Sequence, residues 1–209
     1  MTNVALPVGA PVAPQAVLKR PERRVFTGPR VSLVPLDADA HAADLFALGH
    51  GSPAAEAIWT YMPYGPFGDE AGMHAWLAEQ AQPLDPLFFA VIDNASGRAA
   101  GMVSFLNIVP EHRRLELGHI WYGLPYQGTG INAAAVDLML RHTFDDLAYR
   151  RAEWKCDALN ARSRAAALRL GFSYEGTFRQ HIIYKGRNRD TAWFAMTDWD
   201  WKSRIEEQD

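Results

Sequence analysis

The segment Tyr126–Asn132, with the sequence Tyr-Gln-Gly-Thr-Gly-Ile-Asn, has the composition of an anion-binding loop. It lies between a predicted strand and a predicted helix. Glycines let the backbone approach a ligand closely, and the first turn of a helix presents unpaired N–H groups with a partial positive charge. No acidic residue occurs between Glu116 and Asp137, so no side chain competes with a bound anion. The alternative is an ordinary strand-to-helix turn that contains two glycines.

Two known nucleotide-binding loops can be compared with this segment. A P-loop requires Lys and then Ser or Thr after its last glycine, whereas Gly130 is followed by Ile131 and Asn132. Residues 128–133 match the dinucleotide-binding pattern G-x-G-x-x-A, and Asp157 lies near the end of the next predicted strand. In that fold, however, the loop follows its strand directly at the start of a repeating βαβ unit. A dinucleotide-binding oxidoreductase is therefore the less favoured alternative.

The periodicity of apolar residues predicts the elements that would position this loop. Strands are predicted near residues 31–34, 87–92, 99–107, 114–122, 152–156, 174–183 and 191–198. Helices are predicted to run from Asp37 or Asp39 to about Leu48, after an Asp69 cap through Leu77, and over 128–147 and 161–170. This order predicts an α/β protein of the α+β type. Its single domain would contain a mixed, mostly antiparallel sheet, with a central parallel pair around the 128–147 helix, flanked by helices.

The composition is that of one globular domain with an arm. The 209 residues are 48% hydrophobic and 22% charged, with a net charge of -3, which excludes a disordered chain and does not indicate nucleic-acid binding. Residues 1–25 are predicted to be an N-terminal arm, and residues 26–205 the folded domain. A single cysteine, Cys156, excludes an intramolecular disulfide and a cysteine-rich zinc site, so no metal is expected. Residues 1–17 lack the basic start of a secretory signal, and no apolar run suits a membrane span, so the expected location is the cytoplasm.

The loop resembles the acyl-CoA pyrophosphate loop of the GCN5-related N-acetyltransferases, the GNAT superfamily. Gln127-x-x-Gly130-x-Asn132 is similar to the Q/R-x-x-G-x-G/A pattern of that family. Asn132 departs from the pattern, because this position is usually small. The side chain of Asn132 must therefore point away from the diphosphate or donate a hydrogen bond to it.

A second block, about 30 residues later, strengthens the resemblance, because both blocks occur at the family's spacing. Residues 160–163 and 170–172 are similar to the second conserved block of the superfamily. Further matches indicate its RimJ/RimL-like branch, which acetylates protein N-termini and various small amines; they are Glu175, Gly176, Arg179 and Gln180. The resemblance covers about residues 30 to 200.

The resemblance implies a GNAT-like domain that uses acetyl-CoA and releases CoA. The strand 116–122 would splay away from the strand 152–156, and the pantetheine arm would lie in the gap. The residues implied to bind the cofactor are Ile120 and Tyr122 on the strand, Gln127, Gly128, Thr129, Gly130, Ile131 and Asn132 in the loop, and Asn160 and Ser163 in the second block. An alternative role for Asn160 is that of a helix N-cap.

The implied catalytic residues are Ser163 and Glu116. The tyrosine that protonates the leaving thiolate in many members is replaced by Ala167, and the resemblance to the RimL branch implies that Ser163 takes over, directly or through a water. The alternative is a serine on a helix surface. Oxyanion stabilisation would come from a backbone N–H near Ile120.

Glu116 stands where histone-acetylating members carry a glutamate and would relay the proton of the amine. Strand alternation predicts that Glu116, Gly118, Ile120 and Tyr122 share one face. The alternative for Glu116 is an exposed charge paired with Arg113 or Arg114. The later acid of the RimL branch is replaced by Ile182, which leaves His119 and His181 as other candidate bases.

An aromatic loop, residues 59–67, is expected to contact the acceptor through Trp59, Tyr61 and Tyr64, joined by Trp121; the alternative is that these residues form core. Because the loop has no basic cluster, a phosphorylated or strongly acidic acceptor is not expected.

The implied activity is transfer of an acetyl group from acetyl-CoA to a primary amine, in a small molecule or at a protein N-terminus, directly within a ternary complex. The alternative is a non-catalytic acyl-CoA-binding sensor or interaction module on the same fold. No nucleic acid or membrane partner is expected, and the oligomeric state is open, with a homodimer among the alternatives.

Overall fold

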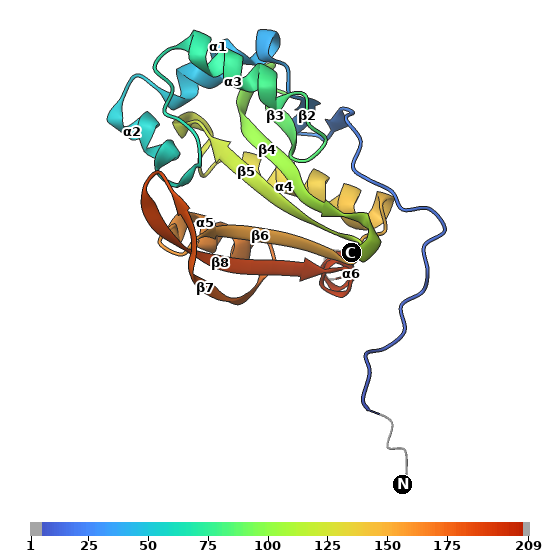
Figure 1. Cartoon of the computed structure of the whole chain (residues 1–209). Helices are drawn as coiled ribbons and strands as arrows, with labels where there is room; N and C mark the ends of the chain where they lie inside the picture. Colours follow the sequence, from blue (N-terminus) through green and yellow to red (C-terminus); the bar gives the residue numbers. More distant parts are fainter. Residues whose placement is uncertain (1–5, 207–209) are drawn as a thin grey trace.

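The computed structural model describes residues 6–206, which form one eight-stranded sheet with helices on both faces (Figure 1). The strand order in the sheet is β1-β2-β3-β4-β5-β6-β8-β7. The strands are β1 (Phe26–Thr27), β2 (Val31–Pro35), β3 (Leu87–Asp93), β4 (Arg98–Val109), β5 (Arg114–Tyr122), β6 (Arg151–Asp157), β7 (Ser173–Tyr184) and β8 (Arg187–Thr197).

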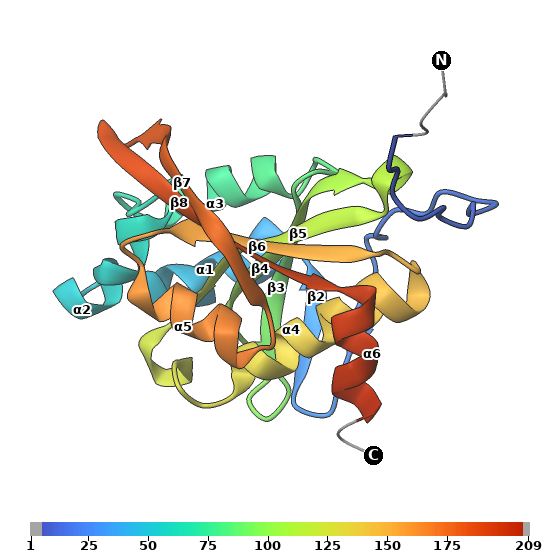
Figure 2. The same cartoon turned by 90° about the horizontal axis from the view of Figure 1, so that it is seen from below.

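The helices divide between the two faces of the sheet. The α-helices are α1 (Ala38–Gly49), α2 (Pro53–Glu56), α3 (Glu70–Gln80), α4 (Ile131–Arg141), α5 (Ala161–Arg169) and α6 (Asp198–Glu206). Short 3-10 turns are η1 (Ala57–Tyr61), η2 (Pro110–His112) and η3 (Leu124–Tyr126), and η4 (His142–Asp146) is a π-helical turn that continues α4. Helices α4, α5 and α6 lie on one side of the sheet (Figure 2), and their buried residues share one cluster.

The predicted mixed sheet with a splayed parallel pair is confirmed. All neighbouring strands are antiparallel except β5 and β6, which pair in parallel. This pairing covers only residues 114–116 of β5 and residues 151–153 of β6. Beyond them the two strands diverge (Figure 1). The edge of β5 from residue 117 onward therefore has no strand partner on the β6 side.

A β-bulge in β5 corrects the prediction that its even-numbered residues share one face. Met102 of β4 pairs with Trp121, and Ser104 pairs with Gly118, so two residues of β5 oppose one residue of β4. His119, within the bulge, has a φ of 52°. The extra residue reverses the phase of the strand, so residues on either side of the bulge change faces.

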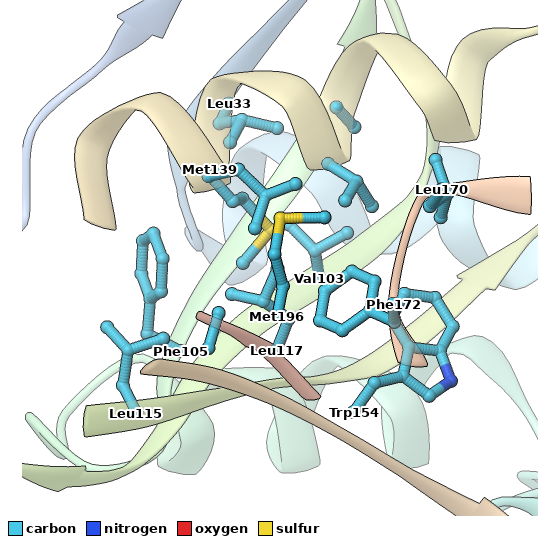
Figure 3. Packing of buried hydrophobic residues seen from close by; sticks show 14 of the residues in the cluster. Leu33, Val103, Phe105, Leu115, Leu117, Met139, Trp154, Leu170, Phe172 and Met196 are labelled. Atoms are coloured by element: carbon cyan, nitrogen blue, oxygen red, sulfur yellow. The ribbon is translucent and has the colours of Figure 1, made fainter. Parts of the chain in front are cut away.

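The hydrophobic clusters, one on each face of the sheet, show this reversal. The larger cluster lies under α4 and contains Tyr122, with Ile120 packed against it. The second cluster lies under α1 and α3 and contains Trp121. Figure 3 shows the larger cluster, where α4 meets side chains from several strands; they include Leu33, Val103, Leu115, Leu117, Met139 and Trp154. Since Leu115 and Leu117 also lie in this cluster, Glu116 faces the opposite side from Ile120 and Tyr122.

The predicted helix over residues 128–147 is shorter than expected. It begins at Ile131, because Gly128 and Gly130 have φ values of 72° and 90° and thus form the preceding loop. It ends at Arg141, where the π-helical turn begins. Other predicted caps are as expected: the carboxylates of Asp37 and Asp69 accept hydrogen bonds from the first turns of α1 and α3.

The N-terminal segment 6–25 contains no helix or strand and makes contacts with the folded domain. The Gln15 side chain donates to the Leu147 carbonyl, and the Tyr149 hydroxyl donates to the Lys19 carbonyl. The first strand begins at Phe26, and the arm boundary at residue 25 stays a prediction. None of the described helices has the length and apolar character needed to span a membrane.

Candidate active site

The N-terminus of α4 forms a cradle suited to an anion. Gly130 is the N-cap of this helix, no side chain caps the first turn, and the first turn has no acidic residue. A Cβ atom on Gly130 would lie 3.2 Å from the Nη1 atom of Arg30, so the guanidinium lies beside the loop. Uncapped N–H groups, a helix dipole and a guanidinium favour a phosphate-type anion. This donor set fits the diphosphate of CoA.

Two side chains of the loop stabilise its conformation by hydrogen bonds to main-chain carbonyls. The Gln127 amide donates to the Tyr122 carbonyl at 2.9 Å, which ties the loop to the end of β5. The Thr129 hydroxyl donates to the Tyr126 carbonyl at 2.7 Å. The Oδ1 atom of Asn132 is buried without a hydrogen-bond partner among the described residues, so this side chain oxygen points into the protein. The backbone amides of the loop therefore remain the groups available to a ligand.

The second block lies at the start of α5, next to β6. The Asn160 side chain accepts a hydrogen bond from the Ser163 backbone N–H at 3.1 Å, so Asn160 is the N-cap of α5. The Ser163 Oγ atom accepts a hydrogen bond from the Trp154 indole at 3.0 Å. Because the hydroxyl accepts this bond, its own proton stays available to another acceptor. Ala167, at the position of the missing tyrosine, is fully buried.

The bulge of β5 lies where the strand has left β6, and Ile120 and Tyr122 belong to the part of β5 that has no strand partner on that side. Contact of these two residues with the cofactor's pantetheine arm stays a prediction. His119 stacks on Tyr64 and contacts Phe88. Burial, and secondarily the positive charge of Arg189, lower the pKa of His119 to about 4. His119 is thus a neutral imidazole at physiological pH.

Glu116 is a buried member of an ion cluster and not the exposed charge that the alternative reading described. Its Oε2 atom accepts hydrogen bonds from the Asn107 amide at 2.7 Å and from the Lys155 ammonium at 2.8 Å. Lys155 also pairs with Glu153 at 2.9 Å. Burial alone would raise the pKa of Glu153, but hydrogen bonds from Lys155 and Arg151 outweigh it and leave that pKa below its usual value.

An open cavity of about 390 Å³ lies above this ion cluster. It opens on the sheet face that carries Glu116. Five strands contribute to its walls, through Asn107, Arg114, Glu116, Lys155, His181, Ile182, Arg189, Thr191 and Trp193. We call it the cationic cavity, because three permanent cations and one carboxylate line it. The cavity places Glu116 and the candidate base His181 together, although the His181 ring is hydrogen-bonded to the Thr191 hydroxyl at 2.9 Å.

The β7–β8 hairpin contributes to the wall of this cavity, and its tip lies on the side of the molecule that carries α2 (Figure 1). At its tip, the Lys185 ammonium donates to three main-chain carbonyls, those of Trp59 at 2.8 Å, Tyr64 at 3.2 Å and Gly65 at 2.8 Å. Burial lowers the pKa of Lys185. We call this contact the hairpin latch. It holds together segments 59–65 and 185, which are far apart in the sequence.

The predicted acceptor residues occupy different environments. Trp59 and Trp121 are 1% and 4% exposed and belong to the second hydrophobic cluster, in agreement with the alternative that the aromatic loop forms core. Tyr64 is half-buried between Trp76 and His119. The Tyr61 hydroxyl donates to the Leu159 carbonyl at 3.3 Å. Contact of these four residues with an acceptor stays a prediction.

Sequence reasoning missed three cations of the site. Arg30 lies at the diphosphate cradle, Lys155 holds Glu116, and Arg189 lines the cationic cavity. A lone arginine or lysine carries no motif, so only the tertiary structure brings these residues to their partners. No cluster of His, Cys, Asp and Glu suitable for a metal ion occurs within residues 6–206.

The fold, the splayed strands and the glycine cradle agree with a domain of the GNAT type. The family model described as the acetyltransferase (GNAT) domain matches residues 30–173, which is more than half of the chain. The chain therefore belongs to the GNAT acetyltransferase family, which confirms the resemblance seen in the sequence.

Solved structures of similar sequence share this fold. A GCN5-related N-acetyltransferase from Brucella melitensis is 42% identical, with a TM-score of 0.85 over 88% of this chain and 83% of that chain. A probable acetyltransferase of the GNAT family from Chromobacterium violaceum is 38% identical, with a TM-score of 0.83 over 94% of this chain and 100% of that chain.

A curated relative agrees with the RimJ/RimL-like branch. The ribosomal-protein-serine acetyltransferase of Escherichia coli (strain K12) is 35% identical over 80 residues, which are 38% of this chain and 44% of that protein. With a Bacillus subtilis (strain 168) relative, YdaF, the match covers 51% of this chain and 57% of YdaF. The chain thus spans about half the length of these curated relatives.

Proposed function

We propose that the protein is an N-acetyltransferase that moves the acetyl group of acetyl-CoA to a primary amine, directly, in a ternary complex. The observation that carries the proposal is the cradle at Gly130, with its uncapped helix N-terminus and the guanidinium of Arg30, at the end of a strand that has left its neighbour. When bound, acetyl-CoA supplies an acetyl group activated as a thioester.

Residues of the chain would bind the cofactor, stabilise the oxyanion and transfer the protons. Loop amides 128–132 and Arg30 would hold the diphosphate, and the free edge of β5 would bind the pantetheine arm. A backbone N–H of the bulge near Ile120 would stabilise negative charge on the acetyl oxygen. Ser163 would donate its proton to the departing thiolate. Glu116 lies on the other face of β5 and would take or relay the proton of an amine that enters from the cationic cavity.

The direct test is acetyl-CoA turnover with a panel of small amines and peptides, followed as release of free thiol and as acetylated product by mass spectrometry. The proposal predicts acceptor-dependent thiol release with one acetyl group added per thiol. Two residues favour the non-catalytic alternative. Ala167 stands where many family members carry the tyrosine that protonates the thiolate, and Ile182 stands where the RimL branch carries an acidic residue. CoA binding without turnover of any amine would establish that alternative.

Ser163→Ala is expected to lower kcat about 100-fold and to leave CoA affinity nearly unchanged. General acid–base assistance is typically about 10²–10⁴-fold, and a thiol with an ordinary pKa of about 8.5 needs little help to leave. Steady-state kinetics and calorimetry with CoA measure the two effects separately.

The control is Trp154→Phe, because Ser163→Ala also deprives the Trp154 indole of its acceptor. Trp154→Phe removes that donor and keeps the hydroxyl, so it is expected to keep most of kcat. If both variants lose the same activity, or if Ser163→Ala loses CoA binding, Ser163 has a packing role and the assignment as acid is wrong.

Glu116→Gln is expected to lower kcat/KM at pH 7 by at least tenfold and to regain most of the loss at higher pH. Primary amines with pKa values of about 8 to 10 are mostly protonated at pH 7 and lose the proton unaided as pH rises. Kinetics from pH 6 to about pH 9, within this amine titration range, measure the recovery.

The matched control is Glu111→Gln, which removes an exposed carboxylate from the turn between β4 and β5. It is expected to follow the wild-type profile throughout. A Glu116→Gln profile parallel to that of the wild type would assign Glu116 to the ion cluster alone, and the proton would then pass to water, His119 or His181.

A further inference from the structure

The residues that line the cationic cavity carry more positive than negative charge. Arg114, Lys155 and Arg189 line it, and Glu116 is the carboxylate in its wall. Lys155 is already neutralised, because it pairs with both Glu116 and Glu153. Arg114 lies 3.8 Å from Glu153. The charge that lacks a counterion is therefore that of Arg189, which forms no salt bridge with any acidic side chain among residues 6–206.

Two hydrogen-bond donors in the same wall also lack acceptors. The Nε atom of Arg189 and the Nε1 atom of Trp193 are buried, and neither has a partner within the described part of the chain. Both residues lie on β8 and line the cavity. Lys155 holds the Trp193 ring in place, because its ammonium lies 3.9 Å from the ring centroid. Buried donors without acceptors are costly, so an anionic oxygen that reached either donor from the cavity would stabilise it.

We propose that Arg189 and Trp193 bind an anionic oxygen group, a carboxylate or a phosphate, on the amine acceptor, so that its amine points toward Glu116. The inference rests on the proposed function, because it specifies the acceptor of that reaction. It differs from the expectation, drawn from the aromatic loop, that a phosphorylated or strongly acidic acceptor does not bind. That expectation considered one segment, whereas the cations come from three strands.

Two further observations support this assignment. The positive charge of Arg189 contributes to the lowered pKa of His119, so its field reaches the bulge of β5, where the acetyl group would lie. The residues that line this wall from β7 and β8 also lie outside residues 30–173, the segment that matches the family model. Acceptor recognition is thus placed in a part of the chain separate from the cofactor cradle.

The kinetic test compares acceptors in matched pairs. Amino acids with increasing separation between amine and carboxylate are each compared with their carboxamide, and an aminoalkyl phosphate is compared with its amino alcohol. The variants are Arg189→Gln, Arg189→Lys and the control Arg187→Gln, which makes the same change two residues away on the same strand, outside the cavity lining.

The wild type is expected to acetylate the anionic member of a pair faster than its neutral partner. If the preference occurs with the amino acids, the bound group is a carboxylate; if it occurs with the aminoalkyl phosphate, the bound group is a phosphate. Arg189→Gln should lower kcat/KM for that acceptor at least tenfold, mainly through KM, and leave the neutral partner and the KM for acetyl-CoA unchanged. Arg189→Lys should retain part of the preference, and Arg187→Gln all of it. An equal loss for charged and neutral acceptors, or no preference in the wild type, would overturn the proposal.

A binding test separates this proposal from the proposed function. With saturating CoA occupying the diphosphate cradle, inorganic phosphate and acetate are titrated into each variant, and tryptophan fluorescence reports binding near Trp193. At least one anion is expected to bind the wild type and Arg187→Gln, and to bind Arg189→Gln about tenfold more weakly. Identical titrations for wild type and Arg189→Gln would refute the anion site. Arg189-dependent anion binding without turnover of any amine would instead refute the proposed catalysis alone.

Discussion

Gly130→Glu is expected to weaken CoA binding at least tenfold, which corresponds to about 1.4 kcal/mol. Three effects act together. Gly130 has a φ of 90°, which a residue with a side chain adopts only under strain. The new carboxylate would lie at the positive end of α4, where the diphosphate is expected. It would also lie next to Arg30 and pair with the guanidinium. Isothermal titration calorimetry with CoA measures the change.

The matched control is Gly51→Glu. Gly51 has a similar φ of 86°, and a Cβ atom there would meet no other atom within 4 Å. This variant introduces the same strain and the same charge between α1 and α2, and it is expected to bind CoA like the wild type. Unchanged affinity in a folded Gly130→Glu variant would refute the assignment of the cradle to the diphosphate.

Lys155→Met is expected to lower the free energy of unfolding by about 3 kcal/mol, the lower end of the range for breaking a buried ion pair. Lys155 bridges Glu116 and Glu153, whose side chains are only 7% and 6% exposed. Glu153 would keep its partner Arg151 at 2.9 Å. Glu116 would keep only the Asn107 amide, and its charge would stay buried without a cation. Urea unfolding at pH 7 measures the loss.

Two further variants test whether the uncompensated charge causes this loss. Lys202→Met removes an exposed lysine on α6 and should change stability by less than about 0.5 kcal/mol. The double variant Glu116→Gln with Lys155→Met removes both charges and should recover most of the stability. A double variant no more stable than Lys155→Met would attribute the loss to packing against Trp193 instead.

The sequence was informative about elements whose pattern is local. The strand predicted over 114–122 has the same bounds as β5, and the caps Asp37 and Asp69 lie where side-chain chemistry predicts them. Period-two alternation failed within β5, because a bulge inserts one residue and its position depends on pairing with β4. The predicted helix 128–147 was too long at its start, because Gly128 and Gly130 adopt positive φ values, and at its end, because apolar residues continue into the π-helical turn.

The candidate site was only partly predictable for the same reason. The glycine loop, Asn160 and Ser163 belong to contiguous motifs, so their placement in the sequence indicated a common function. The environment of Glu116 depends on Lys155 and Asn107, which lie on two different strands. The sheet topology brings these three residues together, and no spacing along the chain encodes that topology. Arg30 and Arg189 were missed for this reason too.

The hairpin latch has a consequence for how such a protein can diversify. The proposed cofactor cradle lies within residues 30–132, whereas part of the wall of the cationic cavity comes from the β7–β8 hairpin, whose tip is anchored by Lys185. Within residues 6–206, the Lys185 ammonium bonds to main-chain carbonyls alone, so the anchor does not depend on which side chains the aromatic loop carries. If the cationic cavity binds the acceptor as proposed, substitutions between the ends of the hairpin can change the choice of acceptor and leave the cradle for the acetyl donor unaltered.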